Sequence, residues 1–324
     1  MTMRELAKLA SVSVSTVSKA FHDAEDISAE TRELVFETAK KYGCFGKFYK
    51  GKFHKQVIAI ICPELGGGFY TTYVEQMQQI IESHNGIALI SADHFSKAAQ
   101  SELLEYYASY LQVDGIIIFQ LQGPLKKGYE IPIVSLFSAP DPTVDTVQVN
   151  LATPMEDAIR LLRSHGHEKI TFIGEKLTHL KAEVFRRAIE EGAPRIIESN
   201  FRFEKAGEDG VRQLLANYPD TTAIVCAYDN IAFGAIKQLK RSGYRVPEDI
   251  SVVGIDNIST AEHAETSLTT IDTNPREMCM LAWDIIQKKQ ESKYYHSTQT
   301  ITITGKLILR ETVGPVKTKD APKV

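Results

Sequence analysis

Runs of valine and isoleucine alternate with helical stretches from residue 57 to about residue 290, and this alternation limits the possible fold more than any other feature. Such runs are typical of strands buried on both faces, joined by the helical crossovers of a parallel sheet. The predicted strands are 57–62, 87–91, 115–119, 131–137, 147–149, 170–174, 223–227 and 251–255. The predicted helices are 70–84, 154–165, 184–191, 230–242 and 275–289. Eight strands can form one barrel or two doubly wound sheets. Two α/β lobes are favoured, because neither the composition nor the spacing of the segments repeats eight times.

The residues that follow the strands are candidates for a ligand site, because open α/β sheets bind ligands beyond the carboxyl ends of their strands. Three glycines at 66–68 follow the first strand and precede Phe69 and Tyr70. Neither G-K-[ST] nor G-x-G-x-x-G accompanies them, so a turn that places two rings at a cleft is favoured over a phosphate loop. Asp229 and Asp256 follow two later strands. Carboxylates beside rings suit polyhydroxyl recognition, and capping of the next helix is the alternative for Asp229.

The first 43 residues predict three short helices. Thr2 and Glu5 form a capping box, which starts the first helix near residue 3. Ser13 and Ser28 are the predicted N-caps of the second and third helices, and Gly43 is placed to end the third. One side of the third helix is predicted to carry Leu34, Val35, Thr38 and Tyr42.

The second helix of this segment has two different faces. Val17, Ala20 and Phe21 lie within one apolar arc. The opposite arc carries small, hydrogen-bonding and cationic side chains, namely Val14, Ser15, Ser18 and Lys19. The major groove of DNA can admit a helix with such a face near its N-terminus. Helix-turn-helix geometry also occurs in bundles that bind no DNA, so this segment alone leaves both interpretations open.

Charge is distributed unevenly along the chain, whose net charge is −4. Residues 1–56 carry ten Lys or Arg and seven Asp or Glu, which gives +3 and leaves −7 for the remainder. Residues 44–56 contain four lysines, one histidine and no acid. A basic segment beside a small helical head indicates an end that contacts phosphates, and a solvated linker is the alternative.

Several other classes of protein are not expected. No signal-peptide pattern is present and no apolar run approaches the ~20 residues that span a bilayer, so a cytoplasmic protein without a membrane partner is expected. The four cysteines form no C-x-x-C pair and the nine histidines show no metal spacing, so neither a disulfide, a metal nor a cofactor is expected. No hydrolase, metalloprotease, kinase or P-loop motif is present, although Asp229 and Asp256 could act as an acid/base pair.

A series of ordered motifs runs from Thr2 to about Thr312. The head contains LAKLA from residue 6 and VSVSTVSK from residue 12. The remainder contains VDGII from 113, GHEKI from 166, DNIAFGA from 229, RVPEDISVVGIDN from 245, LTTI from 268 and LRET from 309. In these motifs the chain strongly resembles the lactose-repressor/galactose-repressor (LacI/GalR) family of bacterial transcription regulators.

The resemblance implies a homodimer whose heads bind a pseudo-palindromic operator in double-stranded DNA. It also implies a periplasmic-binding-protein-like core that takes a small effector, usually a sugar, between two lobes. The family's base-contacting positions correspond to Val14, Ser15 and Lys19. Its phosphate-contacting positions correspond to Thr2, Ser13, Thr16, Ser18, His22, Ser28 and Thr31. Lys19 can donate to O6 or N7 of guanine, without the bidentate fork of the arginine that is common there.

The linker departs from the family's pattern. In the family a linker helix enters the minor groove, where an apolar side chain opens a base step. Phe53 stands at that position here, with Lys50 and Lys52 beside it, in the sequence CFGKFYKGKF from residue 44. Gly51 costs about 1 kcal/mol of helix propensity, which weakens the expectation of a linker helix.

The implied effector site departs as well. Gly67-Gly68 replaces the usual Asn-Pro, Phe137-Ser138 replaces the usual Asp-Arg, and Lys181 stands where an arginine is usual. The effector-binding residues implied by the resemblance are Phe69, Tyr70, Phe137, Lys181, Asp229 and Asp256. These departures leave open an atypical sugar or another small molecule as the effector.

These expectations divide the chain into five segments. They are a helix-turn-helix head at 1–43, a basic linker at 44–56, an N-terminal lobe at 57–149 plus about 275–303, a C-terminal lobe at 150–274 plus about 304–313, and a disordered tail at 314–324. The predicted function is a repressor whose operator affinity is controlled by an effector. The alternatives are a cytoplasmic sugar-binding module with a helical interaction head, and a carbohydrate-acting enzyme.

Overall fold

The chain divides into two compact units. The computed structural model describes residues 1–22, 24–49, 55–126, 128–189, 193–291 and 297–316. One unit consists of Met1–Glu64, Met77–Thr146 and Met280–Gln299, and the other of Leu65–Gln76, Val147–Cys279 and Thr300–Val324. The boundaries predicted above for the head, linker, lobes and tail stay a prediction.

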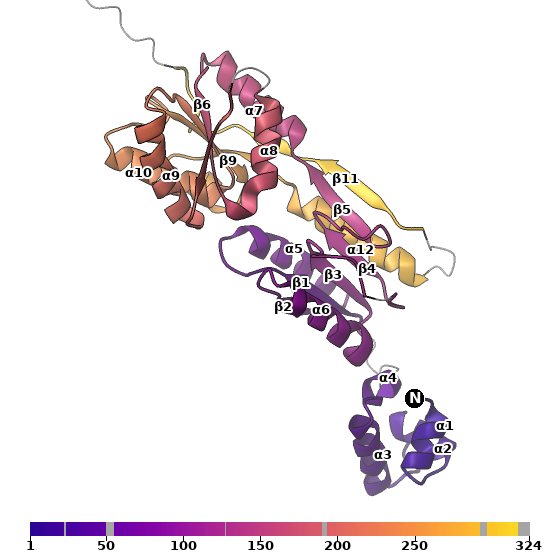
Figure 1. The fold of residues 1–324 in the computed structure, drawn as a ribbon. Coiled ribbons are helices and arrows are strands. Elements are labelled where there is room, and N and C mark those ends of the chain that lie inside the picture. The colour runs from indigo at the N-terminus through magenta and orange to yellow at the C-terminus, as the bar shows by residue number, and fades with distance from the viewer. Residues whose placement is uncertain (23, 50–54, 127, 190–192, 292–296, 317–324) are drawn as a thin grey trace, which may run out of the picture. The chain divides into compact units, whose positions relative to one another are not determined.

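The N-terminal head consists of four short helices (Figure 1). They are α1 (Met3–Leu9), α2 (Val14–Phe21), α3 (Ala29–Lys41) and α4 (Phe45–Tyr49). The predicted starts of the first three are confirmed: Thr2 and Glu5 form a capping box, and Ser13 and Ser28 accept from backbone N–H groups of their helices. Gly43 follows α3 with a φ of 65°, the left-handed conformation that glycine favours after a helix.

The core of the head is apolar and includes part of the predicted linker. Leu6, Val17 and Phe21 are buried, as predicted. On α3 the prediction was partly wrong, because Val35 and Ala39 are buried, while Leu34 is 50% and Tyr42 46% exposed. The core cluster continues into α4, whose aromatic side chains pack against it: Phe45, Phe48 and Tyr49. The packed part of the head therefore extends through α4.

The first sheet has six strands in the order β11-β5-β4-β3-β1-β2. Their bounds are β1 Val57–Cys62, β2 Ile87–Ala92, β3 Gly115–Phe119, β4 Ile133–Leu136, β5 Asp145–Asn150 and β11 Thr300–Thr304. Strand β1 is parallel to β2 and β3, and β3 is parallel to β4. The helices of this part are α5 Phe69–Ser83, α6 Lys97–Glu105, the π-helical segment Tyr106–Leu111 and α12 Pro275–Glu291.

The second sheet also has six strands, in the order β12-β10-β9-β8-β6-β7. They are β6 Ile170–Glu175, β7 Arg195–Ser199, β8 Ala223–Cys226, β9 Ser251–Asp256, β10 Thr269–Asp272 and β12 Lys306–Ile308, the last antiparallel to β10. The helices are α7 Ala152–Ser164, α8 His179–Ala188, α9 Phe203–Asn217, α10 Asp229–Arg241 and the short α11 Thr260–His263, with a 3₁₀ turn at Lys176–Thr178. Figure 1 shows α7 and α8 on one side of this sheet and α9 and α10 on the other, the doubly wound arrangement.

The predicted fold class is therefore confirmed, and the eight predicted strands all exist. The prediction missed β7, β10, β11 and β12. Three of these, β7, β11 and β12, are edge strands. An edge strand is partly open to water and need not be a continuous apolar run, so a run of valine and isoleucine does not mark these three strands.

The end of the described chain is attached to the second unit. The N–H of Gly314 donates to Oγ of Ser251 over 3.1 Å, and the N–H of Val316 donates to the carbonyl of His165 over 2.8 Å. Disorder was expected from residue 314 onward, whereas these bonds hold residues 314–316 in place. No described helix is long and apolar enough to cross a membrane.

Helices α9 and α10 approach each other through glycine. A Cβ added to Gly234 would lie 1.9 Å from the carbonyl oxygen of Glu204, and one added to Gly207 would lie 2.0 Å from that of Ile231. Gly234→Ala should therefore force the helices apart and lower the free energy of unfolding by about 1 to 3 kcal/mol. Urea denaturation measures the effect. Lys205→Ala, at an exposed position of α9, is the control, and equal stability of the two variants would contradict the close approach.

Candidate nucleic-acid interface and small-molecule site

Helix α2 separates a buried face from an exposed one. Val17, Ala20 and Phe21 are at most 1% exposed, while Val14 is 42% exposed. Ser15 is exposed and Lys19 is half-exposed. The three predicted base-contacting residues, Val14, Ser15 and Lys19, therefore lie on the outward face of one helix, where they are accessible to a partner.

Five of the seven predicted phosphate-contacting residues lie at helix N-termini. They are Thr2 at α1, Ser13 and Thr16 at α2, and Ser28 and Thr31 at α3. The Ser13 hydroxyl accepts from the N–H of Thr16 over 3.0 Å, and the Ser28 hydroxyl accepts from the N–H of Thr31 over 3.2 Å. A hydroxyl that accepts from the backbone still has a proton to donate, and a helix N-terminus favours an anion. Each of these ends can thus cap its helix and meet a phosphate.

The remaining two phosphate candidates lie at the other end of α2. Nδ1 of His22 is 2.7 Å from the carbonyl oxygen of Ser18. That contact orients the ring, and His22 is exposed. The three minor-groove candidates of the linker, Lys50, Lys52 and Phe53, lie outside the described residues.

Lys19 has a partner that the sequence did not predict. Its ammonium donates to the carboxylate of Asp26, in the turn between α2 and α3. This hydrogen bond from Lys19 holds the pKa of Asp26 below its usual range. The seven-residue separation crosses a helix end, so no helical spacing rule could have indicated the pair.

A second group of candidate residues gathers at the carboxyl ends of strands in the second unit. Nζ of Lys181, from α8, is 2.9 Å from Oδ1 of Asp256 and 2.9 Å from the carbonyl oxygen of Ala227. The same ammonium lies 5.4 Å from the ring centroid of Phe69 and 6.0 Å from that of Tyr228. The structure therefore brings together Phe69, Lys181 and Asp256, as a cation between a carboxylate and two aromatic rings.

Asp256 is held in an unusual conformation. It has a φ of 110°, and the next residue, Asn257, has a φ of 51°. Residues other than glycine occupy this region at a cost, and such strain is concentrated at functional sites. Arg310 supports the turn by donating to Oδ1 of Asn257 over 2.8 Å. Burial raises the pKa of Asp256 to about 6, although the charge of Lys181 and its hydrogen bond oppose the shift.

Asp229 lies beneath this group and is fully buried. Its carboxylate accepts from Oγ1 of Thr270 over 2.5 Å and from the N–H of Ile258 over 2.8 Å. Burial, together with the charge of Asp256, raises its pKa to about 8. Capping was the alternative role for Asp229, but Tyr228 is the N-cap of α10 and no side-chain capping bond forms. Asp229 instead ties the turn after β9 to the sheet, and its role toward an effector stays a prediction.

Gly254 makes room for that carboxylate. A Cβ at residue 254 would lie 2.2 Å from Oδ1 of Asp229. The sequence places glycine inside strand β9, and the close approach of a buried carboxylate is the physical reason.

Two other predicted effector residues have different surroundings. The ring of Tyr70 packs edge-on against Phe69, with 5.0 Å between centroids. Phe137 belongs to the first unit, has a φ of 74° and lies 6.1 Å from the ring of Phe119. Phe137 therefore lies in a different unit from Lys181, and its role toward an effector stays a prediction.

Three polar and aromatic residues near this group were missed. The hydroxyl of Tyr228 accepts from the N–H of Phe203 over 2.9 Å, and burial raises the pKa of Tyr228. The guanidinium of Arg202 lies 4.7 Å from the ring of Phe203, and its Nε is 3.8 Å from the buried carboxylate of Glu175. Tyr228 could have been found from its place directly after β8, whereas Arg202 and Phe203 follow the edge strand β7, which was itself missed.

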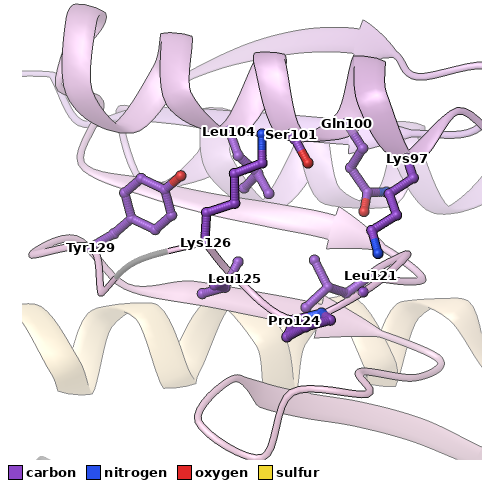
Figure 2. A pocket seen from close by; sticks show the side chains of 10 residues that line it. Lys97, Gln100, Ser101, Leu104, Leu121, Pro124, Leu125, Lys126 and Tyr129 are labelled. Carbon is purple, nitrogen blue, oxygen red and sulfur yellow. The ribbon is translucent and has the colours of Figure 1, made fainter.

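A separate small cavity lies in the first unit, beside α6 (Figure 2). It is lined by Lys97, Gln100, Ser101, Leu104, Leu121, Gly123, Pro124, Leu125, Lys126 and Tyr129. Its volume of about 10 Å³ is room for one water molecule, whereas pockets for small ligands measure about 300 to 1,000 Å³. This cavity is therefore not an effector site as it stands.

Two protein-family models match separate stretches of this chain. Residues 2–43 match the family model of bacterial regulatory proteins of the lacI family. Residues 159–313 match the model of the periplasmic binding protein-like domain. The chain belongs to the lacI family of bacterial regulatory proteins. The predicted resemblance is thereby confirmed, and the chain is a transcriptional regulator of this family.

Relatives of this lacI-family chain span nearly its whole length. The HTH-type transcriptional repressor CytR of Escherichia coli (strain K12) is 27% identical over 289 residues, which cover 83% of this chain and 84% of that protein. The ribose operon repressor of Haemophilus influenzae is 26% identical and covers 98% of this chain and 99% of its own length. A LacI-family regulator from Silicibacter pomeroyi has the same fold, with a TM-score of 0.73, 20% identity and coverage of 97% and 99%. The transcriptional regulator CelR in complex with cellobiose has a TM-score of 0.66 at 23% identity, with coverage of 96% and 99%.

Proposed function

We propose that this lacI-family regulator is a repressor that acts as a homodimer on a pseudo-palindromic operator and is controlled by a small effector. The exposed face of α2 carries the proposal, because it presents Val14, Ser15 and Lys19 above a packed apolar core. Three capped helix N-termini supply the accompanying phosphate contacts. Two relatives named above are repressors, which supports repression over activation.

The proposed effector is a sugar or a sugar derivative. Solved relatives of the same fold hold cellobiose and ribose, which supports a carbohydrate class. In this chain the group around Lys181 offers a cation, a carboxylate and aromatic rings, which suit hydroxyl groups and the apolar face of a sugar ring. Phe69, Tyr70, Phe137, Lys181 and Asp256 are the proposed contacts, with Asp229 supporting the turn that carries Asp256. By linkage, an effector that weakens operator binding must itself be bound less tightly by the operator complex.

The salt dependence of DNA binding tests the central part of the proposal. The full chain is mixed with labelled duplexes from a random library, and the retained fraction is measured at several salt concentrations. A regulator that neutralises about six to ten phosphates should lose about 10³-fold or more in affinity between about 50 and 200 mM salt. A sugar-binding module whose head contacts proteins would retain no duplex even at low salt, and that result would reject the proposal.

A thermal-shift screen tests the effector class. Sugars, sugar phosphates and nucleobases are added singly, because a ligand that binds only the folded core stabilises it by about 2.7 kcal/mol at 100 times its Kd. A stabilising sugar should also change operator retention. Chemical conversion of that sugar by the protein would instead support the enzymatic alternative, which the names of the relatives do not favour.

A further inference from the structure

The ion pair between Lys19 and Asp26 lies within the proposed DNA interface. Lys19 is on the outward face of α2, and Asp26 is in the turn that follows. The two side chains are 43% and 60% exposed, so neither is a core residue. An exposed ion pair contributes little to stability, and a structural role does not account for an acid at a surface that should meet phosphates.

We infer that Asp26 is a specificity-determining residue: it positions the Lys19 ammonium on guanine and itself accepts from a neighbouring cytosine. The inference rests on the proposed DNA-binding function and extends it to a residue outside the predicted set of contacts. Lys19 and Asp26 act on this view as one unit that contacts two adjacent base edges.

The donors and acceptors of the two side chains fit this role. An ammonium has three donors, so one can remain on Asp26 while two face O6 and N7 of guanine. Lysine alone is a flexible point charge that any phosphate can satisfy. The contact with Asp26 limits where the ammonium can go and gives it a defined position.

The carboxylate adds selectivity of its own. It can only accept, and on the major-groove edges its usual partner is the amino group of cytosine. Phosphates and the acceptor atoms of the wrong bases repel it. An acid at this position therefore lowers the affinity for DNA in general and lowers it least for the sequence that offers the matching donor.

A comparison of variants separates this role from a simple charge effect. The full chain is incubated with a random library of duplexes of about 30 base pairs, and the bound fraction is sequenced. Asp26→Asn removes the carboxylate. Glu25→Gln is the matched control, because it removes the same charge from an exposed neighbour that does not pair with Lys19. Lys19→Ala and the double variant complete the set.

We expect both Asp26→Asn and Glu25→Gln to raise the affinity for DNA in general. Only Asp26→Asn should lower base discrimination, by about tenfold, both at the guanine that Lys19→Ala also relaxes and at the adjacent cytosine. The double variant should lower it little further, because the two residues act together. If Asp26→Asn keeps the sequence preference of Glu25→Gln, the inference is wrong. If the wild-type chain enriches no sequence, the proposed DNA-binding function fails instead.

Discussion

Replacing Phe21 by alanine is expected to abolish DNA binding while the α/β core stays folded. Phe21 is 1% exposed, and its ring lies 5.2 Å from Phe36, 5.8 Å from Phe45 and 5.5 Å from Phe48. Truncation of a buried phenylalanine costs about 3 to 5 kcal/mol. A domain as small as this head has little more stability than that, so the variant head should be largely unfolded.

Two measurements on the full chain check this expectation. Mobility shift at low salt should show no retained duplex for Phe21→Ala. Calorimetry should show the unfolding transition of the α/β core unchanged, because its hydrophobic core consists of other residues. Leu34→Ala is the control in the same head, since Leu34 is 50% exposed and its truncation should leave binding intact. Normal DNA retention by Phe21→Ala would contradict the proposed role of the head.

Replacing Lys181 by methionine is expected to destabilise the second unit strongly at alkaline pH and weakly at acidic pH. The side chain of Asp256 is only 3% exposed, and Lys181 is its ion-pair partner. Removing one member of a buried pair leaves an unpaired buried charge and costs about 3 to 5 kcal/mol. That cost applies only while Asp256 is ionised.

The direction of the pH effect follows from the pKa of Asp256. Burial raises it to about 6 in the folded protein, above the value near 3.9 of an unfolded chain. Because the folded protein binds this proton more tightly than the unfolded chain, protonation of Asp256 stabilises the fold. This stabilisation is fully present below the unfolded pKa and is lost as the pH rises through the folded pKa. Without Lys181 the pKa of Asp256 in the folded protein should rise further, so the variant should continue to lose stability up to a higher pH than the wild type. The difference between variant and wild type should therefore be small near pH 5 and should reach about 2 to 3 kcal/mol near pH 8, because each pH unit above the wild-type pKa adds up to about 1.4 kcal/mol.

Urea denaturation of both proteins at several pH values measures this difference. Contributions that the two proteins share cancel in the comparison. Lys176→Met is the matched control, because Lys176 is exposed on the neighbouring turn and its loss should be nearly neutral at every pH. A destabilisation of Lys181→Met that is equal at pH 5 and pH 8 would show that the charge of Asp256 is not what Lys181 compensates.

Local sequence signals accounted for much of the head and of the strands. Thr2 with Glu5, Ser13 and Ser28 each start a helix because the bond that satisfies a first-turn N–H is made within three residues. Interior strands such as β1, β3 and β9 are equally local, because burial on both faces favours a continuous apolar run. The interior strand β10 begins with two threonines, has no such run and was missed. Edge strands such as β7 lack that requirement and were missed.

The surroundings of the site residues depended on contacts that are distant in sequence. Lys181 and Asp256 were both candidates, but their pairing joins residues 75 positions apart. Asp229 was also a candidate, and only its contacts with Thr270 and Ile258 show that it supports the turn. Tyr228, Arg202 and Phe203 entered the group because the sheet brings the ends of several strands to one edge.

The sequence by itself therefore determined the helix starts of the head, most of the interior strands, the two-lobed α/β class and the family, because these depend on short-range patterns and ordered motifs. The tertiary structure decided that α4 packs into the head, that Asp26 holds Lys19, and that Asp229 lies buried beneath Asp256 and Lys181. The physical reason is that burial and charge pairing arise between side chains that only the folded chain brings together.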